Sequence, residues 1–288
     1  MINWFFQYKA NKMINHEINI NDIQNSKKIL FCLFTRYGDT IIDLVVIKEF
    51  IEEYPDKDYL ILCPKQMKPY ANEIIPKIKC IGISKRNWIE MFQIDLILKK
   101  WSPDIGFNPW SNGLDSCYFL SYCKKYPFYQ NLIKPEVINH YQIVRKYLNL
   151  KVKDWKVSDL APSAGYKKIL ICPESTDHER SISNNQLDKI INKVKLGFDN
   201  PLITIASMSF EYLRDNSNSF IFKKNARSSQ NFIKLLKDSD LIVCADSAPL
   251  HIANALKKDV IVVFNSTSPE IVINSGDKLS VCKDEKYG

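Results

Sequence analysis

The chain has 288 residues, of which 45% are hydrophobic and 25% are charged, and its formal net charge is +8. This composition is too apolar for a disordered chain and suits one large domain or two medium-sized ones. No apolar run approaches the roughly 20 residues that span a bilayer, which argues against an integral membrane helix. The positive charge favours an anionic partner such as a nucleotide or a phosphorylated lipid, and the scattered basic residues argue against nucleic acid.

The eight cysteines predict reduced thiols and no metal site. None forms a Cys-x-x-Cys pair, the spacing typical of structural zinc sites. Several lie in apolar runs, where Cys behaves as a small hydrophobe. Because no secretory cleavage site follows the N-terminus, we expect a cytoplasmic protein.

Residues 1–26 form a polar N-terminal extension with a few aromatics, including Trp4 and Phe5. An amphipathic helix resting on an anionic membrane is one interpretation. A segment that packs on the first domain, or a loose tail, is favoured, because terminal extensions are commonly of that kind.

From Lys28 the sequence alternates between strand-like and helix-like segments, the pattern of βαβ units with a parallel sheet. Residues 101–135 are rich in Tyr, Pro, Ser and Asn and give no clear assignment. The predicted segments are strands over 29–34, 59–63 and 79–83, a turn over 35–39, and helices over 40–53, 88–100 and 137–148.

A charged stretch over 151–167 marks the expected boundary between a first domain over 27–155 and a second domain over 156–288. Two such Rossmann-like units with parallel sheets predict a central cleft where ligands bind. The absence of G-x-G-x-x-G and G-x-x-x-x-G-K-[ST] argues against dehydrogenases and P-loop enzymes. The second half is predicted to hold strands over 168–172, 202–206, 241–245 and 260–264 and helices over 184–195, 210–215, 229–238 and 246–256.

The strongest motif lies within residues 244–269 and predicts a strand, a turn, a helix, a second strand and a Ser/Thr loop. Asp246 falls where the strand ends, Ser247 is placed to cap the helix, and Pro249 suits its first turn. The N-terminus of such a helix attracts anions. Helix capping alone would explain Asp246 and Ser247, but not the nearby His251 or the loop that follows.

This region resembles glycosyltransferase family 9, the ADP-heptose:lipopolysaccharide heptosyltransferases. Their pattern is Asp-[Ser/Thr]-Gly-x-x-His-x-x-x-Ala-Leu, then a strand and a Gly-x-Thr-x-Pro loop. Ala248 and Asn265 replace the two family glycines. The matching positions are Asp246, Ser247, Ala248, His251, Ala255, Leu256, Asn265, Thr267 and Pro269, of which the resemblance assigns Asp246, Ser247, Ala248 and His251 to donor binding.

The stretch RYGDT is similar to the opening motif of the same family. The resemblance implies that Asp39 is the catalytic base, which takes the proton of the acceptor hydroxyl as the sugar carbon is attacked. Without the resemblance, an Asp in a turn or at a helix N-cap would be the simpler interpretation.

Two further stretches resemble the donor-binding part of the family. In CPESTDHERSIS, Ser175 and Thr176 match a Ser/Thr pair, and Arg180 falls on the position of a diphosphate-binding Lys. Arg keeps the charge and can grip phosphate with two donors. In residues 207–215, Glu211 falls where an acid binds ribose hydroxyls. Taken alone, Arg180 and Glu211 would be surface charges.

The resemblance implies a GT-B fold and an inverting, metal-independent transfer of heptose or a similar sugar from a nucleotide donor such as ADP-heptose. The implied acceptor is a lipid-linked or phosphorylated saccharide of lipopolysaccharide, lipooligosaccharide or another surface glycan, with peripheral contact at the inner membrane as an option. No cofactor is expected. Two alternatives stay open: a nucleotide-sugar epimerase or hydrolase of similar architecture, and a catalytically degenerate member that acts as a binding protein.

Overall fold

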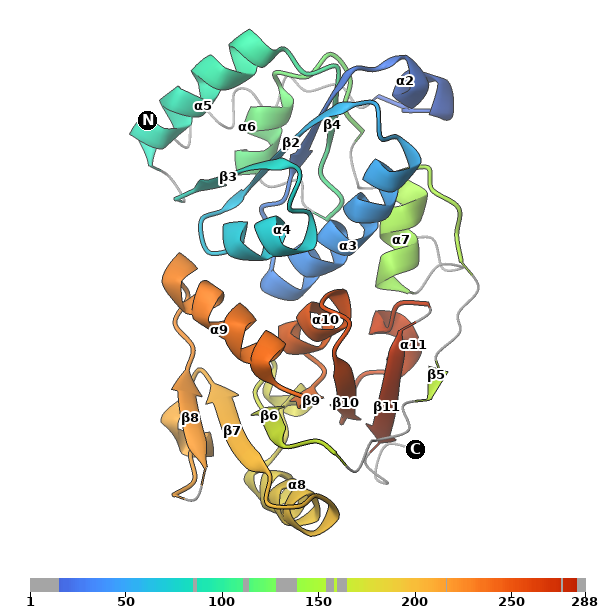
Figure 1. Ribbon diagram of the computed structural model, residues 1–288. Helices are drawn as coiled ribbons and strands as arrows, with labels where there is room; N and C mark the ends of the chain where they lie inside the picture. The colour runs from blue at the N-terminus through green and yellow to red at the C-terminus, as the bar shows by residue number, and fades with distance from the viewer. Residues whose placement is uncertain are drawn as a thin grey trace. The chain divides into compact units, whose positions relative to one another are not determined.

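The computed structural model describes residues 16–84, 87–110, 114–127, 139–153, 158–159, 165–215, 217–275 and 277–283. The chain divides into two compact units, Met1–Val152 and Lys153–Gly288, and each is built on its own parallel sheet (Figure 1). The predicted class, two α/β domains with parallel sheets, is therefore confirmed. The aromatic segment over 1–15 lies outside the described residues.

The first unit has a four-stranded sheet in the order β3-β2-β1-β4, with every pairing parallel. Its strands are β1 (Lys28–Cys32), β2 (Asp58–Pro64), β3 (Lys79–Ile83) and β4 (Ile105–Phe107). Its helices are α2 (Ile20–Asn25), α3 (Tyr37–Glu53), α4 (Lys68–Ile74), α5 (Trp88–Trp101), α6 (Leu114–Leu120) and α7 (His140–Tyr147).

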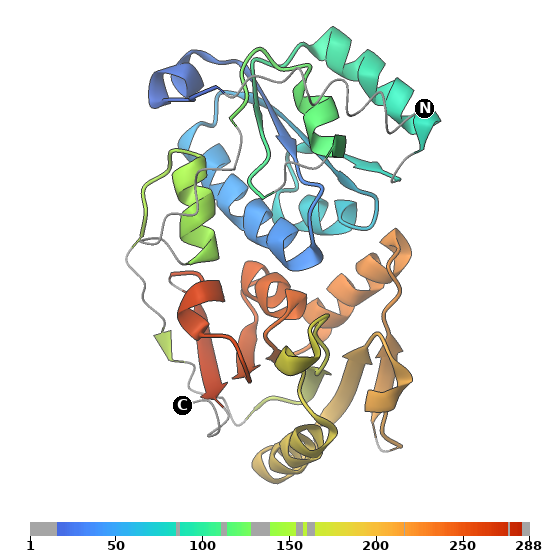
Figure 2. The same ribbon diagram turned by 180° about the vertical axis from the view of Figure 1, so that it is seen from behind.

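Alternate residues of β1 point to opposite faces of this sheet, as the pleat requires. On one face, Leu30 packs with Leu98 of α5 and Phe119 of α6. On the other, the ring of Phe31 contacts Phe50 of α3 and the other aromatic rings that bury this face. Helices α5 and α6 thus cover one side of the sheet and α3 and α7 the other (Figures 1 and 2).

The second unit has a seven-stranded sheet in the order β5-β11-β10-β9-β6-β7-β8, again with parallel pairings throughout. Its strands are β5 (Ser158–Asp159), β6 (Lys168–Cys172), β7 (Leu202–Ser207), β8 (Asn218–Ile221), β9 (Leu241–Ala245), β10 (Asp259–Phe264) and β11 (Lys278–Lys283). Its helices are α8 (Asn184–Gly197), α9 (Ala226–Asp238), α10 (Ala248–Ala255) and α11 (Pro269–Val272), with 3-10 turns η2 (His178–Arg180) and η3 (Phe210–Tyr212).

Helix α8 covers one face of this sheet, where Leu187 and Ile191 pack against Ile169 and Ile171 of β6. Its first turn is fixed by a capping box in which Ser183 accepts from Gln186 N and the Gln186 side chain accepts from Ser183 N. Helices α9 and α10 pack against the opposite face (Figures 1 and 2).

The same device anchors the amino end of the central strand in both units. In the first, the Asp104 carboxylate accepts from the backbone N–H groups of Lys27 and Lys28, at 2.9 and 3.0 Å. In the second, Asp240 accepts from Lys167 and Lys168, at 2.9 and 2.8 Å. Each carboxylate precedes the neighbouring strand, so the bonds set the register of the pair.

Residues 16–26 pack on the first unit. The ring of His16 contacts Tyr126 edge-on, Asp22 pairs with Lys125 at 2.6 Å, and Asn149 donates to the carbonyl of Ile18. Among the described helices, none is long and apolar enough to cross a membrane.

The structure revises two predicted elements and fills one unassigned stretch. Helix α3 begins at Tyr37 and not near Thr40, so Gly38 and Asp39 form its first turn instead of a loop. The helix expected over 210–215 is the single turn η3. Within the unassigned stretch after Trp101, β4 and α6 complete the first sheet and cover it.

Candidate functional site

The loop after β6 is held by side chains. Ser181 Oγ accepts from the backbone N–H of Ser175 at 2.9 Å and lies 3.3 Å from the carbonyl of Asp177. Ser175 Oγ accepts from the N–H of Asp177, and Ser175 is buried while Thr176 is exposed. The Ser/Thr pair predicted from the sequence therefore splits into a serine inside the loop and a threonine on its outer surface.

Arg180 and Asp246 are brought together although 66 positions separate them in the sequence. Because β6 and β9 are neighbours in the sheet, the segments after their carboxyl ends meet. Arg180 Nη1 lies 3.6 Å from Asp246 Oδ2, and Arg180 Nε lies 3.5 Å from Asp177 Oδ2. Both distances exceed the 2.7–2.9 Å typical of charge-assisted hydrogen bonds. The guanidinium is thus shared between two carboxylates without a close bond to either.

Asp246 is 1% exposed, and neither of its carboxylate oxygens accepts a hydrogen bond from the described residues. A buried carboxylate in that state is costly unless a cation or a ligand donor compensates it. Arg180 is the cation that the structure provides beside this buried carboxylate.

Helix α10 starts directly after this aspartate. Ser247 occupies the N-cap position, but its hydroxyl donates to the carbonyl of Ala245 at 3.4 Å and makes no capping bond, so the predicted side-chain cap is wrong. Ala248 and Pro249 open the helix, and His251 is 4% exposed within it. Because Pro249 lacks an N–H and Ser247 does not fold back, the helix N-terminus is not sealed by its own side chains.

Asn265 adds a contact that the sequence did not predict. It follows β10, and its amide donates to the carbonyl of Ser181 at 2.7 Å and accepts from Gln186 Nε2 at 3.0 Å. The side chain that replaces a family glycine therefore ties the β10 loop to the loop after β6 and to the start of α8. The sequence shows a polar residue at a loop position, but the hydrogen-bond partners of Asn265 depend on the order of the strands.

Glu211 is exposed on η3, and the structure brings it to none of the other predicted donor residues by a direct bond. A neighbouring acid that sequence reasoning missed is better placed to shape this edge. Glu174 Oε2 accepts from the backbone N–H groups of Met208 and Ser209, at 2.5 and 3.2 Å, and so joins the segments that follow β6 and β7.

In the first unit, Asp39 lies in the first turn of α3, half-buried, just beyond the carboxyl end of β1. A carboxylate there is stabilised by the helix dipole. One helical turn further, Asp43 is fully buried. Burial raises the pKa of Asp43 well above its ordinary value, the charge of Asp39 adds to the shift, and a hydrogen bond from Trp110 opposes it. The pair thus combines a half-buried carboxylate with a buried carboxyl group whose pKa is raised.

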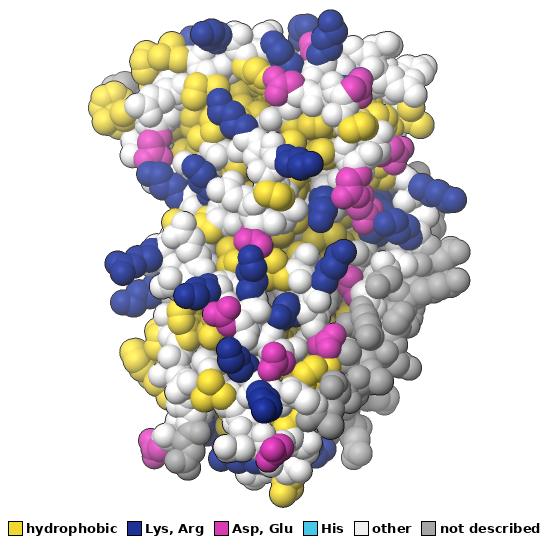
Figure 3. Space-filling view, viewed as in Figure 1, with side chains coloured by type: hydrophobic (Ala, Val, Ile, Leu, Met, Phe, Trp, Pro, Cys, Tyr) yellow, Lys and Arg dark blue, Asp and Glu magenta, His cyan; other side chains and the backbone are white. Residues whose placement is uncertain are grey.

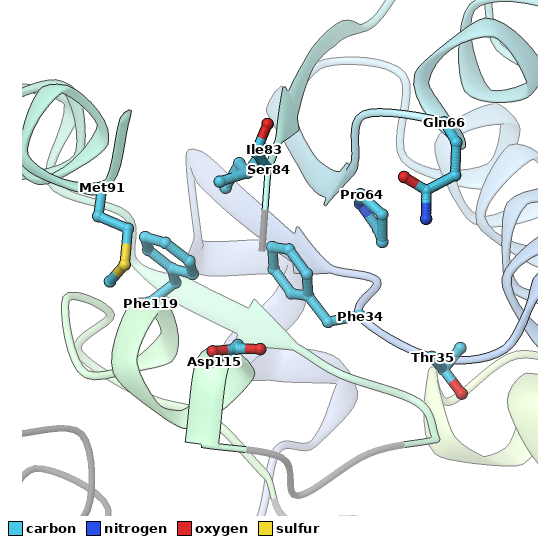
Figure 4. Close-up of a pocket in the computed structure, with 9 residues that line it drawn as sticks. All are labelled: Phe34, Thr35, Pro64, Gln66, Ile83, Ser84, Met91, Asp115 and Phe119. Atoms are coloured by element: carbon cyan, nitrogen blue, oxygen red, sulfur yellow. The ribbon is translucent and has the colours of Figure 1, made fainter. Parts of the chain in front are cut away.

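A pocket of about 200 Å³ opens at the carboxyl ends of the strands of the first unit. Its base is formed by the stacked rings of Phe34 and Phe119, whose centroids are 5.7 Å apart. Figure 4 shows the two rings side by side, with Asp115 below them and Thr35 to one side. Met91 of α5 closes the opposite wall. An aromatic base with polar groups at the rim suits a sugar ring, which presents both C–H and O–H groups.

Among the described residues, no group of three or more His, Cys, Asp or Glu side chains is arranged to hold a metal ion. Seven of the eight cysteines are buried and Cys282 is exposed.

Comparison with known proteins places these features in a family context. The model of glycosyltransferase family 9 (heptosyltransferase) matches residues 228–287, the part that contains β9, α10 and β10. No curated protein sequence matches the chain.

Solved structures match over most of the chain. A family 9 glycosyltransferase from Veillonella parvula has a TM-score of 0.67 at 12% identity, covering 94% of this chain and 89% of its own. Escherichia coli ADP-heptose lipopolysaccharide heptosyltransferase II has a TM-score of 0.63 at 12% identity, with 88% and 92% covered. Escherichia coli heptosyltransferase WaaC with ADP has a TM-score of 0.60 at 13% identity, with 89% and 93% covered.

At these identities the structural matches show the fold, and the family model supplies the sequence pattern. The resemblance predicted from the motifs is therefore confirmed: residues 228–287 match the sequence pattern of glycosyltransferase family 9 (heptosyltransferase), and over most of its length the chain has the fold of the matched heptosyltransferase structures.

Proposed function

We propose that the protein is an inverting glycosyltransferase that moves heptose or a similar sugar from a nucleotide donor to a saccharide acceptor of the cell surface. The observation that carries the proposal is the buried Asp246 beside Arg180, at the start of a helix whose N-terminus is not sealed by a side-chain cap. Such a site supplies positive charge for a diphosphate and acceptor oxygens for sugar hydroxyls.

The donor would bind in the second unit. Arg180 has only long contacts with Asp177 and Asp246, so the phosphates of a donor can recruit it without breaking a short ion pair. Ser175, Thr176, Ser247, Ala248 and the ring of His251 line the proposed diphosphate site, and Glu211 is the proposed ribose partner. The matched structures of WaaC hold ADP and an ADP-fluoroheptose, so an adenine donor such as ADP-heptose is the first to test.

The acceptor would bind in the first unit, with the pocket over Phe34 and Phe119 as the place for its sugar ring. In the transfer, an acceptor hydroxyl oxygen forms a bond to the anomeric carbon as the bond from that carbon to the donor phosphate breaks. Asp39 takes the hydroxyl proton. The leaving diphosphate keeps the electron pair, and Arg180 and the N-terminus of α10 offset its charge. No metal or cofactor is required for these steps.

The proposal is tested by calorimetric titration with ADP, UDP, GDP, CMP and ADP-heptose. We expect one nucleotide to bind and Arg180→Ala to weaken it about tenfold or more, because a charge-assisted contact is lost. Arg214→Ala is the matched control, since Arg214 lies in the same unit and pairs with Asp188. Failure of every nucleotide to bind the wild-type protein would contradict the donor site and leave a binding protein as the better interpretation.

A further inference from the structure

Helix α5 carries apolar side chains on its outer face as well as on its buried one. Trp88 is 67% exposed, Phe92 60%, and Ile89 and Leu96 are each 52% exposed. At the 100° per residue of an α-helix, these four positions fall within an arc of about 100°. They are called the α5 stripe below. The inward side of the helix, through Ile94 and Leu98, is already packed on the sheet.

The stripe differs from the other exposed hydrophobic side chains. In the second unit, the exposed large hydrophobic side chains are spread over α8, β7, the segment around η3 and β11: Leu196, Leu202, Met208, Phe210 and Val281. Figure 3 shows hydrophobic side chains gathered at the upper left, where α5 forms the surface. Contiguous exposed apolar surface of this kind marks a place of contact with another molecule or a membrane.

The charges around the stripe are those that an anionic surface attracts. Lys99 and Lys100 are exposed in the last turn of α5, and Lys85 and Arg86 precede the helix in the sequence. The acidic residues of the helix are occupied by neighbours of the same unit. Glu90 accepts from Lys65 Nζ at 2.5 Å and from Ser84 N at 2.7 Å, and Asp95 accepts from the hydroxyl of Tyr118.

A second copy of the chain, packed stripe to stripe with the helices parallel, would place Lys99 and Lys100 against the same two lysines of its partner. A bilayer with anionic headgroups accepts Trp and Phe at its interface and Lys at the headgroup level in one arrangement.

We infer that the α5 stripe is a docking surface for an anionic lipid bilayer, with Trp88 and Phe92 entering the interface and Lys99 and Lys100 at the headgroups. This deepens the proposed function and rests on it in one respect, the lipid-linked acceptor. Met91, on the same helix, lines the pocket of the first unit, so docking through α5 would hold that pocket near the headgroup layer.

The test is flotation of the full chain with vesicles of phosphatidylethanolamine and phosphatidylglycerol, against vesicles of phosphatidylcholine alone. We expect flotation with the anionic vesicles only. Trp88→Gln/Phe92→Gln should weaken binding about tenfold or more, since the buried apolar area is lost. Lys99→Gln/Lys100→Gln should weaken it by roughly tenfold or more, at about 1 kcal/mol for each lysine. Leu196→Gln, on a leucine of α8 that is 89% exposed, should have no effect.

Three outcomes would overturn the inference. The first is no flotation with anionic vesicles, and the second is flotation that the α5 variants leave unchanged while Trp4→Gln/Phe5→Gln abolishes it. The third is a concentration-dependent dimer in sedimentation velocity that Trp88→Gln/Phe92→Gln converts to monomer, without any flotation.

Nucleotide titration of the same preparations separates the two proposals. Protein that binds nucleotide but does not float contradicts only the α5 surface, and protein that floats but binds no nucleotide contradicts only the donor site.

Discussion

Strands β1 and β6 are held in the same way at their amino ends, but the segments that follow their carboxyl ends differ. Beyond β6, Ser181, Glu174 and Asn265 fix the backbone of the loops by hydrogen bonds, and a cation stands beside a buried carboxylate. Beyond β1, the surface is a pocket with an aromatic base, and among the described residues no cation acts on the pKa of the buried Asp43 carboxyl group.

The difference suits two kinds of ligand. A diphosphate is recognised by charge and by backbone geometry, so its loop must be held in one conformation. A saccharide is recognised by shape, apolar ring faces and a few polar groups. Under the proposed function, the second unit would hold the diphosphate and the first the saccharide, with Asp39 as the base.

If proton transfer belongs to the β1 edge, Asp39→Asn should produce the largest effect. We expect the rate of sugar transfer to fall about 10²–10⁴-fold, the usual contribution of a general base, while calorimetry shows unchanged nucleotide affinity. Asp56→Asn, at an exposed aspartate of the same unit, is the control. Equal transfer rates for Asp39→Asn and the wild type would show that Asp39 is not the general base.

If Arg180 compensates the buried charge of Asp246, removing Arg180 should destabilise the second unit. Arg180→Met leaves Asp246 buried without compensation, and we expect the free energy of unfolding to fall by about 1.5–3 kcal/mol. Adding Asp246→Asn should restore most of that loss, as urea unfolding in a double-mutant cycle would reveal. Additive losses from the two substitutions would show that the pair is not coupled.

The buried carboxyl of Asp43 predicts a pH dependence confined to the first unit. Because its pKa is raised in the folded state, the stability is fully present below the unfolded pKa near 4 and declines as pH rises through the folded value, by up to about 1.4 kcal/mol per pH unit. Asp43→Asn should remove this decline. Tryptophan fluorescence during urea unfolding is a suitable probe, since four of the five tryptophans precede Val152. If the free energy of unfolding of Asp43→Asn still declines with pH, another titrating group causes the decline.

The smallest expected effect is the change in stability when either of two serines of the second unit loses its hydroxyl. Ser183 caps α8 by a side-chain bond, whereas Ser247 makes no capping bond to α10. Ser183→Ala should therefore lower stability by about 1 kcal/mol, and Ser247→Ala should change stability little but weaken nucleotide binding. Thermal unfolding with and without nucleotide measures both. A clear stability loss in Ser247→Ala would show that its hydroxyl caps the helix after all.

Much of the fold follows from local pattern. The apolar runs that became β1, β6, β9 and β10 were predicted within two residues at either end, because buried parallel strands are continuously apolar. The start of α3 was missed because Gly38 suggested a turn, although a glycine is tolerated in a first helical turn. The three-residue strand β4 was missed because so short a segment carries no measurable period.

The candidate site residues were selected from the sequence one by one, and their geometry could not be predicted. Sequence resemblance selected Arg180 and Asp246, yet their approach depends on β9 lying beside β6, an order that neither motif encodes. Asn265 was noted as a departure from a family glycine, and its bonds to Ser181 and Gln186 required the fold. The capping role expected of Ser247 failed because its hydroxyl turns back to the strand.

The order of the second sheet also has a consequence for how that unit folds. Strand β6 pairs with β7 some 34 residues later, but its other partner β9 lies some 70 residues later, and β5 pairs with β11 across about 120 positions. Such long-range parallel pairings close large loops before they gain contacts, which slows folding. During synthesis, β6 must therefore wait for β9 to emerge, and the loop that carries Arg180 acquires its partner Asp246 only then.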